Sequence, residues 1–393
     1  MSSAETRILT AISNAELDRR WTVLRTAMAA DGLDAIVVQS QNDWLGGAVK
    51  WLTDLPATNG YPRTVLFFAD GPMTVIDMGP FGVHRSLDHD PVHRGVGEIF
   101  ATPAFLSIAY THDYEGRLAS DALKRQGCKH IGIVGPGGLP HGLVSLLQRE
   151  HATVDATDLF NRLTAIKSPE ETALIRRTAE LQDAVFARVL AAIKPGMRDI
   201  DVTSLAQHEG QLLGSEQGIF LGCSARLGSV AGFVPRHLQG RTIQPGDHFA
   251  LLIEINGPGG FYAEIARTIV LGRASNELLE GFAQVLAAQD HTLSLIRPGA
   301  NPAEIAAAHD DWMQAHGLPP ELRLYAHGQG YDMVERPMIR VDETMPIAEH
   351  MCLAVHPGFE TPRMFAVICD NYMVEANGPS ACLHHTEKKI FEI

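Results

Sequence analysis

Residues 249–270 carry the clearest structural signal in this chain. They read Phe249-Ala250-Leu251-Leu252-Ile253-Glu254-Ile255-Asn256, then Gly257-Pro258-Gly259-Gly260, then Phe261-Tyr262-Ala263-Glu264-Ile265-Ala266-Arg267-Thr268-Ile269-Val270. Two runs rich in β-branched and aromatic residues thus flank a turn signal of glycine and proline. This pattern predicts a β-hairpin.

Two acids occupy equivalent places in this hairpin. Glu254 and Glu264 are equally far from Gly259, so without a bulge they stand opposite each other, with Cβ atoms about 5 Å apart. Two carboxylates at that spacing repel, and in apolar surroundings a metal ion, a shared proton or a bound cation must compensate. We therefore predict a functional site on this face; the alternative is a solvated surface of paired charges.

Two later segments place polar residues in unusual settings. Residues 325–337 contain His327-Gly328-Gln329-Gly330, where the glycines allow the backbone to turn sharply or to approach a ligand closely. Residues 365–374 read as a strand with Asp370 in its apolar middle. A lone acid in a buried strand needs a partner, so this segment also indicates a site.

The second part of the chain contains a weak internal repeat. Ile193-Lys194-Pro195-Gly196 recurs as Ile296-Arg297-Pro298-Gly299, and each copy leads through an amphipathic helix to an apolar strand. The two strands, 248–254 and 350–356, end in Glu254 and His356. Since repeats usually form pseudo-symmetric units with one core, we expect these two residues near a common pseudo-two-fold axis. Chance similarity of two helix–strand units is the alternative.

The first part of the chain reads as an α/β domain. A helix is predicted over 15–30 and strands over 35–38, 64–68, 74–76 and 130–134. Lys167-Ser168-Pro169-Glu170-Glu171 then starts a long helix that continues to residue 192, with Pro169 as a favourable first-turn residue. We therefore predict a mixed α/β (α+β) fold with two domains, 1–160 and 161–393.

Composition excludes several classes of protein. The 393 residues are 45% hydrophobic and 20% charged, which is typical of a folded soluble protein and not of a disordered or collagen-like one. There are 32 basic and 46 acidic residues and no Lys/Arg-rich run, which disfavours nucleic acid and anionic membranes as partners. Residues 1–20 hold no apolar segment of signal-peptide length, so we expect a cytoplasmic protein. The five cysteines form no Cys-x-x-Cys pair, which indicates core packing.

Taken in order, these motifs resemble the pita-bread superfamily of creatinase, prolidase, aminopeptidase P and methionine aminopeptidase. The likeness rests on the N-terminal α/β domain, the Lys167-to-Glu171 helix start, Gly246-Asp247 before a strand, Glu264-Ile265-Ala266-Arg267-Thr268, His327-Gly328-Gln329-Gly330 and Glu335-Arg336-Pro337. It covers nearly the whole chain, with the most specific motifs between residues 240 and 375. The resemblance implies a creatinase-type N-terminal domain followed by a pita-bread catalytic domain with a pseudo-two-fold internal repeat.

The resemblance also implies a metal site. In the metallopeptidase members, two Asp, one His and two Glu hold two metal ions. Carried over by position, the ligands here would be Glu254, Glu264, His327, His356 and Asp370. Three carboxylates and two imidazoles suit Mn, Fe or Zn. The expected cofactor is one or two such divalent ions, and a metal-free site is the alternative.

Two positions depart from the pattern of the superfamily. Val334 stands where the peptidases have a His before the Glu of their His-Glu motif, and that His steadies the scissile amide. Phe233, two residues before Pro235, stands where creatinase-like members carry a proton-transferring His, and His237 is the available substitute. These departures favour a substrate that is neither an ordinary peptide nor creatine.

We therefore predict a small-molecule hydrolase that cleaves a C–N bond in an amide or a cyclic amidine-like compound. With a metal ion, a water of lowered pKa attacks while Glu335 or Asp332 handles the proton. Without one, Glu254 acts as the nucleophile or orients a water, opposite a protonated Glu264. The predicted substrate-binding residues are His237, Tyr262, Tyr331 and Arg336.

Three alternatives remain beside this hypothesis. They are a C–S lyase resembling the superfamily members that cleave dimethylsulfoniopropionate, an Xaa-Pro-type metallopeptidase, and a catalytically inactive binding module. An acidic pocket would suit the cationic sulfonium substrate of the lyase. The inactive module is disfavoured because polar residues retained within apolar strands cost stability. The resemblance further implies a homodimer paired through the N-terminal domains.

Overall fold

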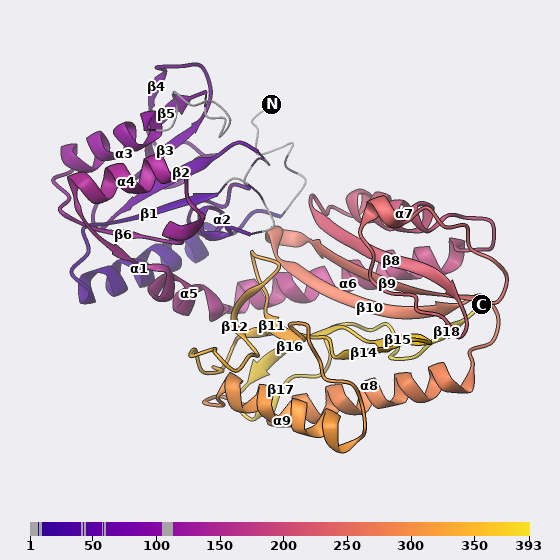
Figure 1. Cartoon of the computed structure of the whole chain (residues 1–393). Helices are drawn as coiled ribbons and strands as arrows, with labels where there is room; N and C mark the ends of the chain where they lie inside the picture. The colour runs from indigo at the N-terminus through magenta and orange to yellow at the C-terminus, as the bar shows by residue number, and fades with distance from the viewer. Residues whose placement is uncertain are drawn as a thin grey trace. The chain divides into compact units, whose positions relative to one another are not determined.

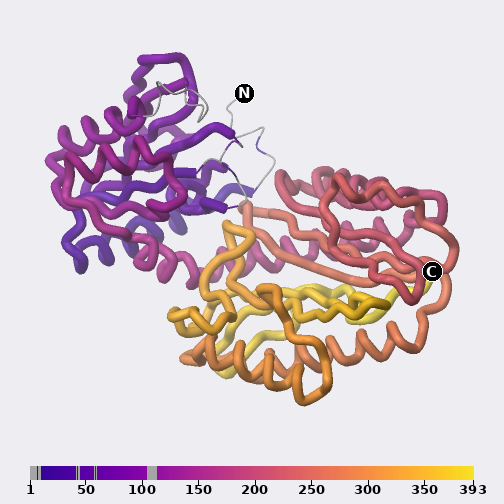
Figure 2. The backbone as a smooth tube through the Cα atoms, in the orientation of Figure 1, coloured from indigo at the N-terminus to yellow at the C-terminus, as the bar shows by residue number. Residues whose placement is uncertain are grey.

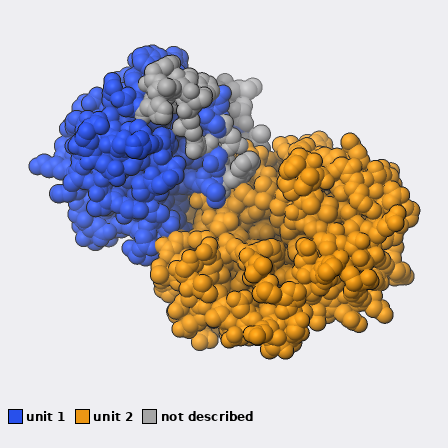
Figure 3. Space-filling model, viewed as in Figure 1, with its two compact units in different colours: residues 1–164 blue, residues 165–393 orange. Residues whose placement is uncertain are grey.

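A computed structural model of the chain describes residues 7, 10–40, 42, 45–56, 58, 60–103 and 113–393. They form two compact units, Met1–Thr164 and Ala165–Ile393, which Figure 3 colours separately. The division falls within helix α5 (Thr157–Ala165), which also contains the boundary predicted near residue 160. Within the described part of the chain, every helix is too short or too polar to span a bilayer. The prediction about a targeting segment in residues 1–20 falls partly outside the described residues.

Unit 1 is built around a seven-stranded mixed sheet with the strand order β4-β5-β3-β2-β1-β6-β7. Its strands are β1 (Ala35–Ser40), β2 (Arg63–Phe68), β3 (Met73–Met78), β4 (His84–Ser86), β5 (Val96–Thr102), β6 (His130–Ile133) and β7 (Ala152–Asp155). Its helices besides α5 are α1 (Asn14–Ala30), α2 (Ala48–Thr53), α3 (Tyr114–Arg125), the 3₁₀ turn η3 (Pro136–Gly138) and α4 (His141–Glu150). All six residues of β1 are buried, which requires cover on both faces, and Figure 1 shows helices on both faces. The α/β class predicted for this part is confirmed.

Local signals set the beginnings of two long helices. The Ser13 hydroxyl accepts a hydrogen bond from the Glu16 N–H at the start of α1. Ser168 and Glu171 form a reciprocal capping box at the start of α6 (Pro169–Ala192). Such a cap contributes about 1 kcal/mol, so both helices begin within a residue of the predicted positions.

Glu115 on α3 is one of the buried acids of unit 1, and its side chain accepts hydrogen bonds from the Thr64 hydroxyl and the Gln39 amide. Burial raises the pKa of Glu115 above its ordinary value of 4.5. The folded state therefore holds this proton more tightly than the unfolded state. The resulting stability is complete below the unfolded pKa and is lost as the pH rises through the higher folded pKa.

We expect the Glu115→Gln variant, which keeps the shape of the neutral acid, to be more stable than the unmodified chain by about 1–2 kcal/mol at pH 8. The gain should vanish near pH 4, where Glu115 is protonated in both states. Urea unfolding of unit 1 at the two pH values measures the difference. Asp121→Asn, an exposed position on the same helix, is the control; an equal response of both variants would contradict the prediction.

Unit 2 contains the predicted hairpin. It lies in a four-stranded sheet of order β18-β10-β9-β8, next to a five-stranded sheet of order β12-β11-β13-β16-β17 and a two-stranded sheet of β14 and β15. The strands are β8 (Gly218–Arg226), β9 (Asp247–Asn256), β10 (Tyr262–Val270), β11 (Ala326–Gly328), β12 (Glu335–Met338), β13 (Cys352–Val355), β14 (Gly358–Thr361), β15 (Met364–Val367), β16 (Asp370–Glu375), β17 (Gly378–Pro379) and β18 (Phe391–Glu392). The remaining elements are α7 (Asp199–Leu212), η4 (Arg236–Leu238), η5 (Pro258–Gly260), α8 (Asn276–Leu295) and α9 (Pro302–Ala315).

The helices of unit 2 form two pairs of matching design. Figure 2 shows the strands of this unit enclosed between the pair α6 and α7 and the pair α8 and α9. Gly196 and Gly299 occupy the connection within each pair, with φ angles of 93° and 85° that favour glycine. The two Pro-Gly sequences of the internal repeat therefore form the same turn between paired helices.

Strands β9 and β10 are buried at every position because both of their faces are covered. On one face, Leu251, Ile253 and Ile265 belong to the apolar core under α6 and α7. On the other, Leu252 and Ala266 pack against Cys369 from the second half of the unit. The two-residue period of a strand places Glu254 and Glu264 on this second face.

The strand predicted over 365–374 is two strands in the structure. β15 pairs with β14, whereas β16 pairs with β13, and Ile368 and Cys369 form the break between them. Cys369 makes an isolated bridge to Ala266 of β10, so the second half of the unit meets the hairpin there. The strand predicted over 350–356 is also shorter, and His356 lies just beyond the end of β13.

Candidate active site

The two hairpin acids face each other. Glu254 pairs with Glu264 in the antiparallel register of β9 and β10, as their symmetrical spacing around Gly259 predicts. Both side chains belong to residues that are only 5% exposed. Burial raises the pKa of Glu264 to about 7 and that of Glu254 well above its ordinary value, where the charge of Glu264 adds to the effect. The pair therefore retains a proton at neutral pH.

Two histidines approach Glu264 from the second half of the unit. One donor atom from each of Glu264, His327 and His356 lies within 4.8 Å of the others, and the three make up the group that satisfies this distance among the described residues. The His327 Nε2 atom lies 3.7 Å from Oε2 of Glu264. The two imidazole rings are 5.1 Å apart at an angle of 67°. The structure thus gathers three of the five residues predicted to bind metal.

Both imidazoles are prepared to act as ligands. Burial lowers the pKa of His327 to about 4 and lowers the pKa of His356 well below its ordinary value, so both rings are neutral at neutral pH. Nδ1 of His327 lies 2.8 Å from the Gly328 carbonyl oxygen, to which its N–H donates. This contact leaves the Nε2 lone pair directed at Glu264, the arrangement that orients metal-binding histidines.

One buried nitrogen atom of this group is left without a hydrogen-bond partner in the described part of the chain. Nε2 of His356 has no hydrogen-bond partner among the described residues although it is shielded from solvent. An unsatisfied buried polar atom costs about 1–3 kcal/mol. A divalent cation would satisfy it, and two imidazoles with one carboxylate form a donor set suited to Zn, Fe or Mn. These residues therefore fit a metal ion.

Glu254 is held by a chain of buried amides that sequence reasoning missed. The Gln329 Nε2 atom donates to Oε1 of Glu254 at 2.7 Å, and Nδ2 of Asn371 donates to Oε1 of Gln329 at 2.7 Å. The backbone N–H of Glu264 donates to Oδ1 of Asn371, also at 2.7 Å. Both amide residues are 0% exposed. This chain ties the two hairpin acids together through the second half of the unit.

The expectation that Asp370 belongs to the metal site is corrected by the structure. Its carboxylate pairs with Arg267 at 2.6 Å, both side chains are 0% exposed, and Gln289 donates to its other oxygen at 3.3 Å. The side chain beside Glu264 is instead that of Cys369, whose Sγ lies 3.5 Å from the Glu264 carbonyl oxygen. Burial raises the pKa of the Cys369 thiol well above its ordinary value, which disfavours the nucleophilic thiolate.

The two other predicted catalytic acids lie outside this group. The Glu335 carboxylate pairs with the Lys167 ammonium at 2.5 Å, and these side chains are 12% and 3% exposed. The Asp332 N–H donates to Glu335 at 3.3 Å. The pair stabilises the loop after β11, and a Cβ at Gly330 would collide with both of its side chains. Glu335 is therefore bound by Lys167, which limits its use as a proton carrier.

Three of the four predicted substrate-binding residues have partners within the protein. The backbone N–H of Tyr262 donates to the Gly330 carbonyl at 2.7 Å. The Tyr331 ring stacks on Phe261 with ring centroids 4.1 Å apart. The Arg336 guanidinium binds Glu343 through two nitrogens and also reaches Thr344. His237 lies exposed on η4, and no described contact links it to Glu264 or the two histidines.

The surroundings of the site are aromatic on one side and cationic on the other. Phe233, at the position where a His was expected, packs against the Leu252, Ala266 and Cys369 cluster and edge-on against Phe365. Arg323 donates to the His356 carbonyl at 3.2 Å, and its side chain is 37% exposed and paired with Glu321. Its charge lowers the pKa of Glu264 and of His356, in each case less than burial shifts it. Sequence reasoning missed Arg323 because it lies in no motif.

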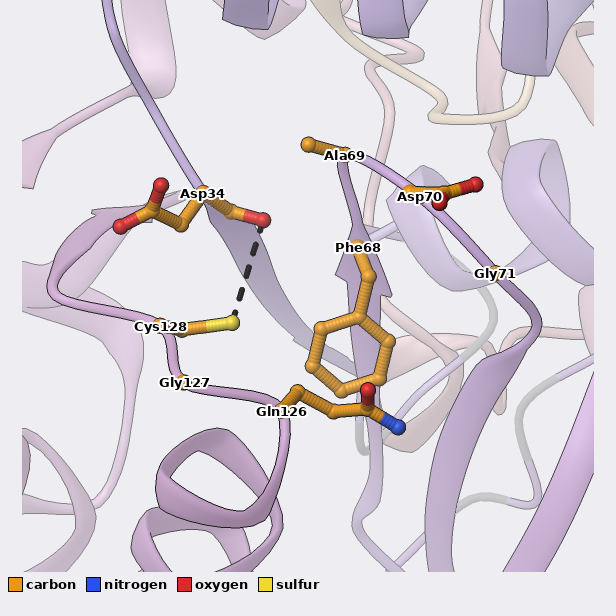
Figure 4. Close-up of a pocket in the computed structure, with 8 residues that line it drawn as sticks. All are labelled: Asp34, Phe68, Ala69, Asp70, Gly71, Gln126, Gly127 and Cys128. Atoms are coloured by element: carbon orange, nitrogen blue, oxygen red, sulfur yellow. Dashed lines mark hydrogen bonds between the residues drawn. The ribbon is translucent and has the colours of Figure 1, made fainter.

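Unit 1 carries a hollow of about 330 Å³, shown in Figure 4. Asp34 in its wall accepts hydrogen bonds from the backbone N–H groups of Lys129 and His130, at 2.7 and 2.9 Å. The Cys128 thiol points to the Asp34 carbonyl oxygen, and burial raises the pKa of Cys128. These groups hold the loop before β6.

Comparison with known proteins agrees with this fold. The model of metallopeptidase family M24 matches residues 173–376 of the 393, more than half of the chain, so the chain belongs to this family. It is 26% identical over 241 residues to the uncharacterized peptidase YqhT of Bacillus subtilis, covering 60% of this chain and 67% of that protein. It is 25% identical over 274 residues to the Xaa-Pro dipeptidase of Pyrococcus horikoshii, covering 67% and 76%.

Solved structures show the same architecture. Dipeptidase PepE of Mycobacterium ulcerans superposes with a TM-score of 0.76 at 21% identity, over 98% of this chain and 99% of that one. The X-Pro aminopeptidase of Thermotoga maritima superposes with a TM-score of 0.77 at 15% identity, over 95% and 99%. The predicted pita-bread fold is therefore confirmed. The expectation of a substrate other than a peptide gains no support from these relatives, whose names describe peptidases.

Proposed function

We propose that this protein is a metal-dependent hydrolase that cleaves the C–N bond of a small amide substrate. The observation that carries the proposal is the gathering of Glu264, His327 and His356 around the orphaned Nε2 atom of His356. Membership of a metallopeptidase family supports the same reaction class. Glu254, a second buried carboxyl opposite this group, supplies the acid–base function that such a hydrolysis needs.

Each residue of the site has a separate role in the proposed reaction. Glu264, His327 and His356 would hold the divalent ion, which supplies a water of lowered pKa and polarises the scissile carbonyl. Glu254 would act in its ionised form, taking the proton from the attacking water and returning it to the leaving nitrogen. Gln329 orients the Glu254 carboxyl. Phe233 and Leu252 exclude bulk water, which strengthens the electrostatic interactions within the site.

The substrate class has two candidates. Val334 and Phe233 occupy positions where the resemblance implies histidines of the peptidases and of creatinase, which favours a non-peptide amide or a cyclic amidine. The names of the relatives favour dipeptides, Xaa-Pro dipeptides among them. Both classes place an amide or amidine carbon next to a leaving nitrogen. A homodimer and a cytoplasmic location stay predictions.

The test is an assay of the purified chain against Xaa-Pro dipeptides, other dipeptides, small amides and cyclic amidines, with Mn, Zn or Fe added to metal-free protein. We expect amine release that chelation lowers by at least about 10³-fold and that re-addition of metal restores. Hydrolysis that persists in stringently metal-free protein would overturn the metal dependence. A protein that binds no divalent metal and turns over no substrate of these classes would overturn the proposed function.

A further inference from the structure

Two of the five residues expected to bind metal are held by partners of their own. Asp370 is neutralised by Arg267 and bonded to Gln289. Glu254 accepts the Gln329 amide at 2.7 Å. The Cys369 thiol and the Asn371 amide contact the backbone of Glu264 from the last part of the chain, and neither is a carboxylate. Both oxygens of Asp370 and Oε1 of Glu254 are therefore bound within the protein, which leaves Oε2 of Glu254 as the one oxygen of these two acids without a bond to these partners.

The backbone N–H of Glu264 fixes the orientation of the side-chain amides of Asn371 and Gln329. The backbone N–H of Glu264 can only donate, so the Asn371 atom 2.7 Å away must be its oxygen. The Asn371 NH₂ group then faces Gln329, whose oxygen must accept, at 2.7 Å. The Gln329 NH₂ group is left to donate to Glu254 Oε1, at 2.7 Å, and to the Met333 carbonyl, at 3.0 Å. Neither amide can flip without breaking two bonds.

The fixed orientation of the two amides determines which oxygen of Glu254 can carry a proton. Its Oε1 atom always faces an N–H donor, so a proton on Glu254 resides on Oε2, the oxygen not bonded to Gln329. Coordination through Oε1 would require the Gln329 amide to leave a position where it is 0% exposed and also bonded to Met333. The Gln329 backbone is anchored as well, since its N–H donates to the Cys352 carbonyl at 3.0 Å.

We propose that the centre holds one divalent ion, bound by Glu264, His327 and His356, and that Gln329 is a positioning residue that keeps Glu254 off the ion and directed at the substrate. This inference rests on the proposed function and deepens it. It departs from the pair of ions that the resemblance implies. The physical reason is that Glu254 and Asp370, which would complete a second ion site, are bound by Gln329 and Arg267.

The first experiment counts the ions. Full-length, metal-free chain is titrated with Mn²⁺ in equilibrium dialysis and followed by electron paramagnetic resonance. We expect saturation at one ion per chain and the spectrum of an isolated Mn²⁺. Two ions per chain with an exchange-coupled signal would overturn this inference and leave the proposed function standing. No bound ion would overturn the proposed function itself.

Variants then separate ligands from the positioning residue. Glu254→Gln should bind Mn²⁺ within about threefold of the unmodified chain, whereas His356→Ala should lose affinity by about 100-fold or more. A loss greater than about tenfold in folded Glu254→Gln protein would make Glu254 a ligand and overturn the inference. This comparison needs no assayable substrate.

Gln329→Met tests the positioning role. We expect it to keep one ion, to lose about 100-fold in kcat, the usual share of acid–base catalysis, and to change KM little. Gln239→Met, a buried amide bonded to Thr203, Phe220 and Val234, is the matched control and should keep kcat within about twofold. An unchanged kcat in Gln329→Met would refute the role of Gln329. If that variant does not fold, the ion count and Glu254→Gln still decide between one ion and two.

Discussion

The Glu264→Gln variant is expected to lose its bound divalent ion and at least about 10³-fold in kcat. Glutamine keeps the shape of the side chain but removes the charge that opposes the cation. Because His327 and His356 are neutral, Glu264 is the one negatively charged ligand of the group. Elemental analysis of the purified variant and a steady-state assay with added metal measure the two losses.

The control for this experiment is Glu360→Gln, which makes the same change on the exposed side of β14. It should keep both metal and activity. A Glu264→Gln protein that is folded, retains a full equivalent of metal and turns over at the normal rate would show that the three gathered residues are not the centre. The histidine variants would not rescue the proposal in that case.

The second large effect concerns the stability of unit 2. Asp370→Asn leaves the Arg267 guanidinium buried without its counter-charge, and breaking such a pair costs about 3–5 kcal/mol. Arg267 also donates to the carbonyls of Cys369, Thr386 and Glu387, so it cannot withdraw to solvent easily. We therefore expect a large loss in the free energy of unfolding of unit 2, with the metal content of the folded protein unchanged.

Urea unfolding and elemental analysis of the same preparation distinguish the two roles of Asp370. Asp342→Asn removes one partner of the exposed pair with Arg340, and it should change stability by less than about 1 kcal/mol. An Asp370→Asn protein of normal stability that has lost its metal would instead restore Asp370 as a ligand, as the sequence predicts.

The parts of the fold with local signals could be predicted from the sequence. The capping box at Ser168 and Glu171 uses contacts between neighbouring residues, and it set the start of α6 correctly. The hairpin depends on a short turn, so symmetrical spacing about Gly259 was enough to place Glu254 opposite Glu264. His327 was identified because the flanking glycines mark its loop.

The last strands could not be placed in the same way. A shift of one residue turns a strand side chain to the opposite face. The break at Ile368 and Cys369 interrupts the alternation, so Cys369 faces the hairpin acids and Asp370 faces Arg267. The apolar run from Phe365 gives no sign of this break, because each of its residues is equally suited to a strand.

The amides of the site escaped sequence reasoning for a different reason. Gln329 and Asn371 are neutral and common, and their importance depends on two bonds to residues far away in the chain. Arg336 was predicted to hold the substrate, but it is bound by Glu343. Its partner Glu343 lies only seven residues later, in a loop whose sequence has no pattern that predicts the ion pair.

The paired helices and their shared Pro-Gly turns make the two halves of unit 2 look like copies of one ancestral module. Their chemistry has nevertheless diverged, since one half contributes the acids of the hairpin and the other contributes both imidazoles. Neither half alone contains all three of Glu264, His327 and His356. An ion bound by residues from both would therefore join the two halves, and its affinity would depend on how well they pack together.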